Sequence, residues 1–296
     1  MKRRIDPRWY VLINNTLLLL LGMKFFGLQR DALQVIFCLV MGNAAEILAA
    51  WVLKKHPTVR VGDRLLSATI ACLSVLILVR SSDWWFYGLL ATTAILSKYL
   101  LVNERGRHFF NPSDFAIVFA LAFLPDHLFF RPDQFSRNAF SFDILLPMIV
   151  GFGAAAAIGA ARWREVAAYY LVVVFVGVPA GLLLGIKYQW VIAPELNTST
   201  LIFSFLMLTD PRTTPSSNRS QWIFGGLVAG LHLTLRYFQI PYSPFISLFV
   251  VSGLWSVLGH LVERAAGPEP VGASALTGKT SAAAGRAWGF SKWNFS

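Results

Sequence analysis

The stretch Leu33–Leu53 reads LQVIFCLVMGNAAEILAAWVL, and its only charged residue is Glu46. An α-helix rises about 1.5 Å per residue, so about 20 apolar residues cross the roughly 30 Å hydrocarbon core of a bilayer. The stretch is therefore predicted to be a transmembrane helix. A strand of a transmembrane barrel would alternate apolar and polar residues, whereas this stretch is almost continuously apolar.

The composition of the chain extends this prediction to its whole length. The chain has 296 residues, of which 56% are hydrophobic and only 14% are charged, against about 25% charged residues in soluble domains. This excludes a water-soluble enzyme, a disordered chain and a secreted disulfide scaffold. We predict an all-α polytopic membrane protein with about ten transmembrane helices, at Tyr10–Phe26, Leu33–Leu53, Leu65–Val79, Trp84–Leu101, Ser113–Leu124, Ile144–Ala161, Val166–Ile186, Thr198–Leu208, Trp222–Tyr237 and Pro244–Val262.

The boundaries of the domain follow from the same pattern. Residues 1–264 are predicted to form a single integral membrane domain. Residues 265–296 are rich in Gly, Ala, Ser and Thr and are predicted to be a flexible C-terminal tail. Cys38 and Cys72 both lie in apolar stretches and are predicted to be buried thiols. No spacing of His, Cys and carboxylate residues predicts a metal site.

The net charge of +11 is explained by orientation in the membrane. With ten spans, 19 of the 26 lysines and arginines fall on the side that carries both termini, and 7 fall on the other. Positive residues collect on the cytoplasmic side. We therefore expect a multi-pass protein of a bacterial-type inner (plasma) membrane with both termini cytoplasmic. Its partner is expected to be the lipid bilayer, and no nucleic-acid partner is expected.

Two of the predicted spans are only half as long as a bilayer requires. Ser113–Leu124 and Thr198–Leu208 would each cover about half of a 30 Å core. The ends of such broken helices lie at membrane depth and must face protein, water or a ligand. In transporters they mark the functional centre. The alternative is that each helix is longer than its apolar stretch and buries its polar ends.

Polar motifs stand at the ends of these two short spans. Asn111 is predicted to cap the first, with Pro112 at its first position and Asp114 reaching back to the cap, as in a capping box. Pro211 disfavours a helical conformation for Asp210, so the second span is predicted to stop there. Both ends are expected on the cytoplasmic side, where they would form one polar pocket.

A weak internal repeat relates the two halves of the chain. Ser81–Ala91 is similar to Ser216–Ala229, and Asn111–Phe115 is similar to Ser243–Phe245. In the expected topology the two copies enter the membrane from opposite sides. This is typical of an inverted repeat, which we predict to have five plus five helices, at about residues 10–130 and 144–264.

Several motifs resemble one family of membrane proteins. They are SKYL at 97–100, RHFFNPS at 107–113, TDPRTTPSS at 209–217 followed by IFG at 223–225, and AEIL at 45–48 with Lys54 and Lys55. The family contains the D subunit of Rnf electron-transport complexes and the B subunit of the sodium-pumping NADH:quinone oxidoreductase (RnfD/NqrB-like). The motifs are most similar to its branch called the enediyne-biosynthesis membrane protein (UnbU-like).

The resemblance implies a ten-helix fold like that of urea transporters and a noncovalent flavin, riboflavin or FMN, on the cytoplasmic side. It further implies an electron-transport role with redox partner subunits. Glu46 takes the place of a glutamate linked in the family to the ion, proton or electron path. The cofactor-binding candidates are Asn111, Asp210, Thr209, Phe110 and Arg212.

Departures from the family pattern limit what the resemblance implies. The family's Ser-Gly-Ala-Thr motif, which carries a covalent FMN, is missing between Leu124 and Ile144, which argues against a covalent flavin. Gly151–Ala154 stands where the family has a Gly-Glu segment, which argues against sodium pumping. As an enzyme, the chain is expected to be at most a non-catalytic or electron-transferring subunit of an oxidoreductase complex.

The residues leave three functions open. The first is a membrane redox subunit that holds a flavin near Asn111 and Asp210. The second is a channel or transporter for an ion or small solute that uses the two broken helices. The third is a membrane component of a biosynthetic pathway. For Glu46, whose burial in a membrane costs roughly 2.5–3.5 kcal/mol, the alternative to function is a structural hydrogen bond between helices.

Overall fold

The structure is a computed structural model, and it describes residues 6–53, 61–102, 108–129, 135 and 139–265. These residues form helices and no strand; Val102 and His108 pair in one isolated bridge. The elements in chain order are α1 Pro7–Phe25, α2 Ala32–Leu53, α3 Val61–Leu78, α4 Phe86–Leu100, α5 Pro112–Phe123, η1 Pro125–His127, α6 Ala139–Gly159, α7 Trp163–Val172, η2 Val173–Gly177, α8 Val178–Leu183, α9 Tyr188–Ile192, η3 Ala193–Leu196, α10 Thr198–Ile202, η4 Phe203–Met207, α11 Asn218–Tyr237 and α12 Ser243–Ala265.

The all-helical prediction is confirmed for the described residues, and a helix lies at each of the ten predicted ranges. Three helical stretches are long and apolar enough to cross a membrane: Ala32–Leu53, Val61–Leu78 and Trp163–Leu183. Shorter apolar helices lie at Pro112–Phe123, Ile144–Gly159, Thr198–Met207 and Ser243–Leu258. The architecture is consistent with a helical membrane protein.

Local sequence fixes the start of several helices through side-chain caps. The Asn111 side chain accepts hydrogen bonds from two backbone N–H groups of α5, and Asp6 caps α1 in the same way. Asn197 caps α10 and Ser217 caps α11. Each cap satisfies donors that a helix leaves unpaired in its first turn, which is why these helices begin where they do.

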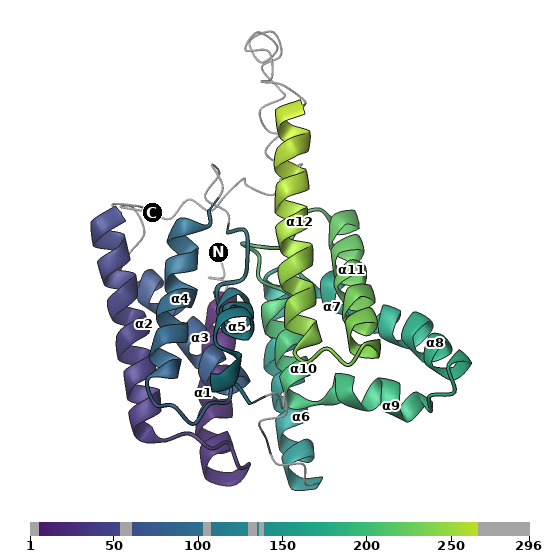
Figure 1. The fold of residues 1–296 in the computed structure, drawn as a ribbon, viewed down its shortest axis with the longest axis horizontal. Helices are drawn as coiled ribbons and strands as arrows, with labels where there is room; N and C mark the ends of the chain where they lie inside the picture. Colours follow the sequence, from purple (N-terminus) through teal and green to yellow (C-terminus); the bar gives the residue numbers. More distant parts are fainter. Residues whose placement is uncertain (1–5, 54–60, 103–107, 130–134, 136–138, 266–296) are drawn as a thin grey trace, which may run out of the picture.

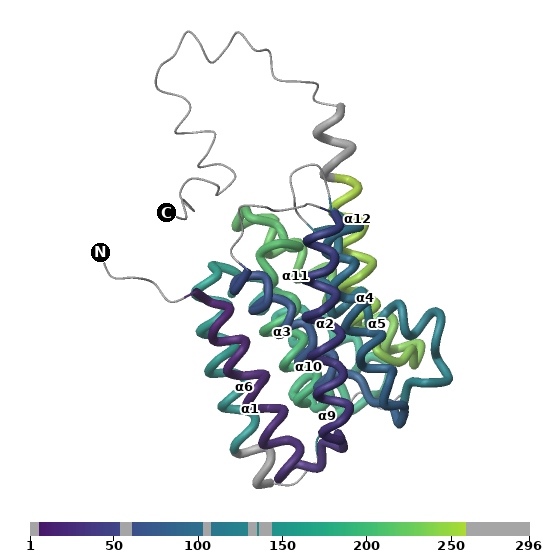
Figure 2. Tube along the Cα trace, turned by 90° about the vertical axis from the view of Figure 1, so that its left-hand side faces the viewer, coloured from purple at the N-terminus to yellow at the C-terminus, as the bar shows by residue number. Residues whose placement is uncertain are grey.

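The helices pack in two sets with a similar order of contacts (Figure 1). Helix α2 packs most extensively against α4, and α7 packs most extensively against α11. The next helix in each set, α5 or α12, then packs against α4 or α11. Helix α1 contacts α3, and α6 contacts α10 with η4. The two sets meet where α1 lies beside α6, as Figure 2 shows, and where α5 contacts α12.

Glycine allows the closest helix approaches in both sets. A Cβ atom on Gly225 of α11 would lie 2.3 Å from the backbone oxygen of Glu165 in α7. A Cβ atom on Gly42 of α2 would lie 2.2 Å from the Cys72 sulfur in α3. Cys72 and Cys38 are both buried and free, as predicted. The second half of α3 is enclosed, since every residue from Ala71 to Leu78 is buried.

Three features of the second set differ from the predicted spans. Helix α6 begins at Ala139, five residues before the predicted Ile144. The elements α8 and α9 extend to one side of the bundle (Figure 1), and α9 with η3 occupies a stretch predicted to be a linker. The segments η2 and η4 are π-helical turns. Such turns are rare and often lie at functional sites.

Candidate functional site

The two short helices meet at their polar ends. Asn111 accepts hydrogen bonds from the backbone N–H groups of Ser113 (3.1 Å) and Asp114 (3.3 Å), which holds its amide in place. Its Nδ2 atom then donates to Oδ2 of Asp210, 3.4 Å away and 99 residues along the chain. This contact, which we call the junction, brings together the two residues that the motifs single out.

The loop that carries Asp210 is tied down by its own hydrogen bonds. The Asp210 carbonyl oxygen accepts from the backbone N–H of Thr213 (3.2 Å) and the hydroxyl of Thr214 (2.8 Å). Arg162, in the turn between α6 and α7, donates to the carbonyl oxygens of Pro211 and Pro215. The junction is therefore built on a defined loop, held by side chains from a distant part of the sequence.

Burial raises the pKa of the Asp210 carboxyl above its ordinary value. The backbone N–H of Arg212, which donates to Oδ1 at 3.0 Å, acts in the opposite direction, as do the charges of Arg212 and Arg162. Desolvation outweighs these effects, so the carboxyl holds its proton to a higher pH than an exposed aspartate does.

The remaining cofactor-binding candidates lie around the junction with their side chains engaged. Thr209 lies in the turn after η4, and its hydroxyl donates to the Phe205 carbonyl of η4 at 2.7 Å. The Arg212 side chain is exposed, and its Nη1 atom lies 3.4 Å from Nε2 of the buried His108. Of the two, Arg212 has the side chain that can reach a ligand without breaking a helix contact.

Phe110 belongs to an aromatic cluster beside the junction. Its ring stacks on Phe249 of α12, with centroids 4.3 Å apart and planes at 11°, and the Phe115 ring lies 5.8 Å away. One face of the Phe110 ring is thus covered by protein. The expected role of Phe110 as a neighbour of a cofactor is limited to its other face and its edge.

The predicted capping box at the start of α5 is wrong. The Asp114 side chain is fully buried, and neither carboxyl oxygen has a hydrogen-bond partner among the described residues. The backbone N–H groups of the first turn are satisfied by Asn111 alone. A buried carboxyl without partners is costly, so Asp114 is a candidate functional residue that the sequence pattern misassigns.

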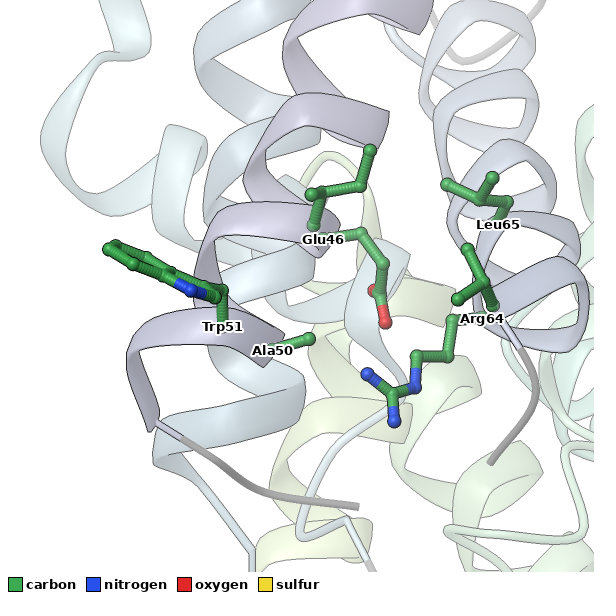
Figure 3. A pocket seen from close by; sticks show the side chains of 7 residues that line it. Glu46, Ala50, Trp51, Arg64 and Leu65 are labelled. Carbon is green, nitrogen blue, oxygen red and sulfur yellow. The ribbon is translucent and has the colours of Figure 1, made fainter. Parts of the chain in front are cut away.

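Glu46 lies in a buried ion pair between α2 and α4. Its Oε2 atom is 2.8 Å from Nζ of Lys98, and its Oε1 atom accepts from the Tyr99 hydroxyl at 2.6 Å. We call these three residues the Glu46 cluster. The carboxylate and Arg64 also point toward a half-open hollow of about 230 Å³ between α2 and α3 (Figure 3). The hollow lies beside the Glu46 cluster. It is not the predicted polar pocket between the ends of the two short spans, near Pro112 and Pro211.

A second buried cluster was not predicted. Glu195 of η3 accepts from His232 and Arg236 of α11 and from Tyr169 of α7, and His232 also contacts Ser243. We call these five residues the Glu195 cluster. Both ring nitrogens of His232 are engaged, Nε2 with Glu195 and Nδ1 with Ser243. The spacing of His232 and Arg236, one helical turn apart, was the available signal, but their partner is distant in sequence.

Within the described residues, no three His, Cys, Asp or Glu side chains are grouped to hold a metal ion. Comparison of the chain with models of protein families finds no match. Comparison with curated proteins also finds none that is similar.

Proposed function

We propose that the chain is a membrane subunit of an electron-transport system, related to the RnfD/NqrB-like family, with a noncovalent flavin on the cytoplasmic side at the junction. The observation that carries the proposal is the 3.4 Å contact between Asn111 and Asp210. Both residues lie in the motifs that resemble those of that family. They are joined although 99 residues separate them.

The chemistry of the junction fits a flavin. The isoalloxazine ring presents carbonyl oxygens and an N–H group along one edge, which an amide and a carboxyl group can pair with. Arg212 supplies a nearby cation for a phosphate or a ring oxygen. Phe110 and Phe249 supply an apolar aromatic surface. A bound flavin would supply one-electron and two-electron redox chemistry, and redox partner subunits would exchange those electrons.

The proposed architecture is an inverted repeat of five plus five transmembrane helices, as in urea transporters. The recurring order of helix contacts supports it: α2 with α4 and α7 with α11, α4 with α5 and α11 with α12. The first set is α1–α5 and the second is α6–α12. In this arrangement both termini would face the cytoplasm of a bacterial-type inner membrane.

A second candidate function is transport of an ion or small solute. The specific observation that favours it is the Glu46–Lys98 ion pair, buried within apolar helices. Charges inside transmembrane segments commonly mark ion or proton paths. Broken helices that meet within the bundle are also typical of transporters.

The visible absorption spectrum of the protein, purified in mild detergent, tests the first proposal. We expect a flavin band that is retained on gentle washing and released by denaturation, and we expect Asn111→Ala to lose it. Asn197→Ala is the matched control, because Asn197 caps α10 as Asn111 caps α5, whereas the side chain that donates to Asp210 is that of Asn111. This control variant should keep the band.

Two results would contradict the flavin proposal. One is a colourless protein that also fails to bind added riboflavin or FMN. The other is equal loss of the flavin in Asn111→Ala and Asn197→Ala, which would assign the effect to helix stability. A colourless protein that accelerates solute uptake into liposomes would favour the transporter.

A further inference from the structure

The Glu195 cluster is a closed set of hydrogen bonds around one carboxylate. Oε1 of Glu195 accepts from Nη1 of Arg236 at 2.7 Å and from Nε2 of His232 at 2.9 Å. Oε2 accepts from the Tyr169 hydroxyl at 2.8 Å. Glu195, His232 and Tyr169 are almost completely buried. Three donors hold the carboxylate in its charged form.

Two side chains can neutralise this single carboxylate: the guanidinium of Arg236 and, when it is protonated, the imidazole of His232. Arg236 is always charged, whereas His232 is charged only when both ring nitrogens carry protons. With a neutral imidazole, Nε2–H donates to Glu195 and Nδ1 accepts from the Ser243 hydroxyl at 3.0 Å. One carboxylate and one guanidinium then balance, and a second buried positive charge would be uncompensated.

The other elements packed around the cluster contribute hydroxyl groups. From α7, Tyr169 donates to the carboxylate, and the Tyr170 hydroxyl lies 3.4 Å from the Glu195 carbonyl oxygen. The Ser204 hydroxyl of η4 contacts Tyr170 at 2.9 Å, and Ser243 begins α12. Among the described residues in contact here, Glu195 supplies the negative charge.

Arg236 links the charge balance to the position of α9. Its guanidinium donates to the carbonyl oxygen of Val191 at 3.0 Å and to that of Trp190. These are backbone groups of α9, so Arg236 joins α9 to α11 while it pairs with Glu195. Its side chain is 26% exposed, against 4% for His232. Arg236 is therefore the cation that can turn toward solvent.

We propose that the Glu195 cluster is a proton-binding site whose occupancy controls how firmly α9 is held against α11. The proton comes from the solvent on the α9 side and binds to Nδ1 of His232. The Ser243 hydroxyl then changes from donor to acceptor. The imidazolium takes over the neutralisation of Glu195, and Arg236 turns into solvent and releases the two carbonyl oxygens of α9.

Hydrogen–deuterium exchange of the full-length protein in lipid nanodiscs tests the site, with peptides that cover residues 188–196. Exchange is measured from about pH 8 to about pH 5, where histidine titrates, and is corrected for the intrinsic pH dependence of amide exchange. We expect protection to fall about tenfold toward acid pH, as for the loss of a charge-assisted hydrogen bond. Arg236→Gln should show the low protection at every pH.

The decisive variant is His232→Gln, whose amide can still donate to Glu195 but cannot take up a proton. Its protection should be high and independent of pH. Glu195→Gln gives a second test, because it removes the carboxylate for which the cations compete, and its exchange should also lose the pH dependence. The control is His127→Gln, since His127 pairs with Asp83 at 2.6 Å in a different part of the structure. This variant should behave like the wild type.

The proposal is overturned if protection of 188–196 in the wild type does not change with pH. It is also overturned if His232→Gln and Glu195→Gln keep the wild-type pH dependence. The measurement uses neither flavin nor transport, so its outcome is independent of the function proposed above.

Discussion

The Glu46 cluster and the Glu195 cluster are built from similar parts but differ in how their charges balance. In each, a buried carboxylate accepts from a tyrosine hydroxyl and from a cation. Glu46 has Lys98 as its cation, with a side chain only 6% exposed. Glu195 has two partners that can carry charge, and Arg236 is partly exposed.

Glu46 is thus paired with one cation, whereas Glu195 can be neutralised by either of two side chains. When Lys98 is removed, Glu46 loses its ion-pair partner and keeps the hydrogen bond from the neutral Tyr99, with Arg64 facing the same hollow (Figure 3). When Arg236 is removed, His232 remains within 2.9 Å of Glu195 and can take a proton to replace the lost charge. The Glu46–Lys98 ion pair between α2 and α4 should therefore depend on Lys98, whereas the Glu195–Arg236 pair between η3 and α11 has a substitute in His232.

The largest effect is expected from breaking the Glu46–Lys98 pair. Lys98→Met should lower the free energy of unfolding by about 3–5 kcal/mol, since it removes the ion-pair partner of a buried carboxylate. Arg236→Met should cost clearly less at acid pH, where His232 can be charged. Unfolding of both variants in mixed micelles of mild detergent and dodecyl sulfate measures the difference.

The double variant Glu46→Leu with Lys98→Met serves as the control for this comparison. It removes both charges and should recover most of the stability lost in Lys98→Met, because apolar side chains can replace a buried ion pair without loss. Equal destabilisation by Lys98→Met and Arg236→Met at acid pH would show that His232 does not replace the lost charge of Arg236.

A smaller effect is expected where glycine sets the distance between helices. In Gly225→Ala the new Cβ would lie 2.3 Å from the Glu165 backbone oxygen, so α7 and α11 must move apart. We expect a loss of about 1–3 kcal/mol, as for overpacking. In Gly42→Ala the close atom is the Cys72 sulfur, at the end of a side chain that can rotate, and the loss should be smaller.

Gly230 provides the matched control on α11. Among the described residues, no atom apart from the nearby part of α11 itself lies within 4 Å of the position of an added Cβ, so Gly230→Ala should be neutral or should raise stability by up to about 1 kcal/mol through helix propensity. The melting temperatures of the three variants in the same detergent give the order. A Gly42→Ala variant less stable than Gly225→Ala would contradict the expectation that an added Cβ costs more stability between α7 and α11 than between α2 and α3.

The sequence predicts features that depend on local pattern. Continuous apolar stretches locate the helices because a membrane requires them. The caps at Asn111 and the stop before Pro211 also follow from local backbone chemistry. The sequence also predicts that the ends carrying Asn111 and Asp210 come together, because both were assigned to one side of the membrane; their direct contact is a finding of the structure.

Features that depend on tertiary contacts could not be predicted in this way. Glu195 lies in a short polar stretch, and nothing near it in the sequence indicates His232 as its partner. Asp114 occupies the position of a capping-box residue, yet it is buried without a hydrogen-bond partner among the described residues. In both cases burial decides the role, and burial is set by helices distant in the chain.

The smallest effect concerns the junction, where Asn111 of the first set meets Asp210 of the second. Burial raises the pKa of Asp210. The stability contributed by the protonated carboxyl is therefore fully present below its ordinary pKa of about 4 and is lost as the pH rises through the raised value. Asp210→Asn keeps the shape and an acceptor for Asn111 but cannot ionise, so its stability should fall less with rising pH than that of the wild type. Thermal unfolding of both proteins from about pH 4 to neutral pH measures this, and parallel curves would show that Asp210 ionises without cost and that the junction is open to water.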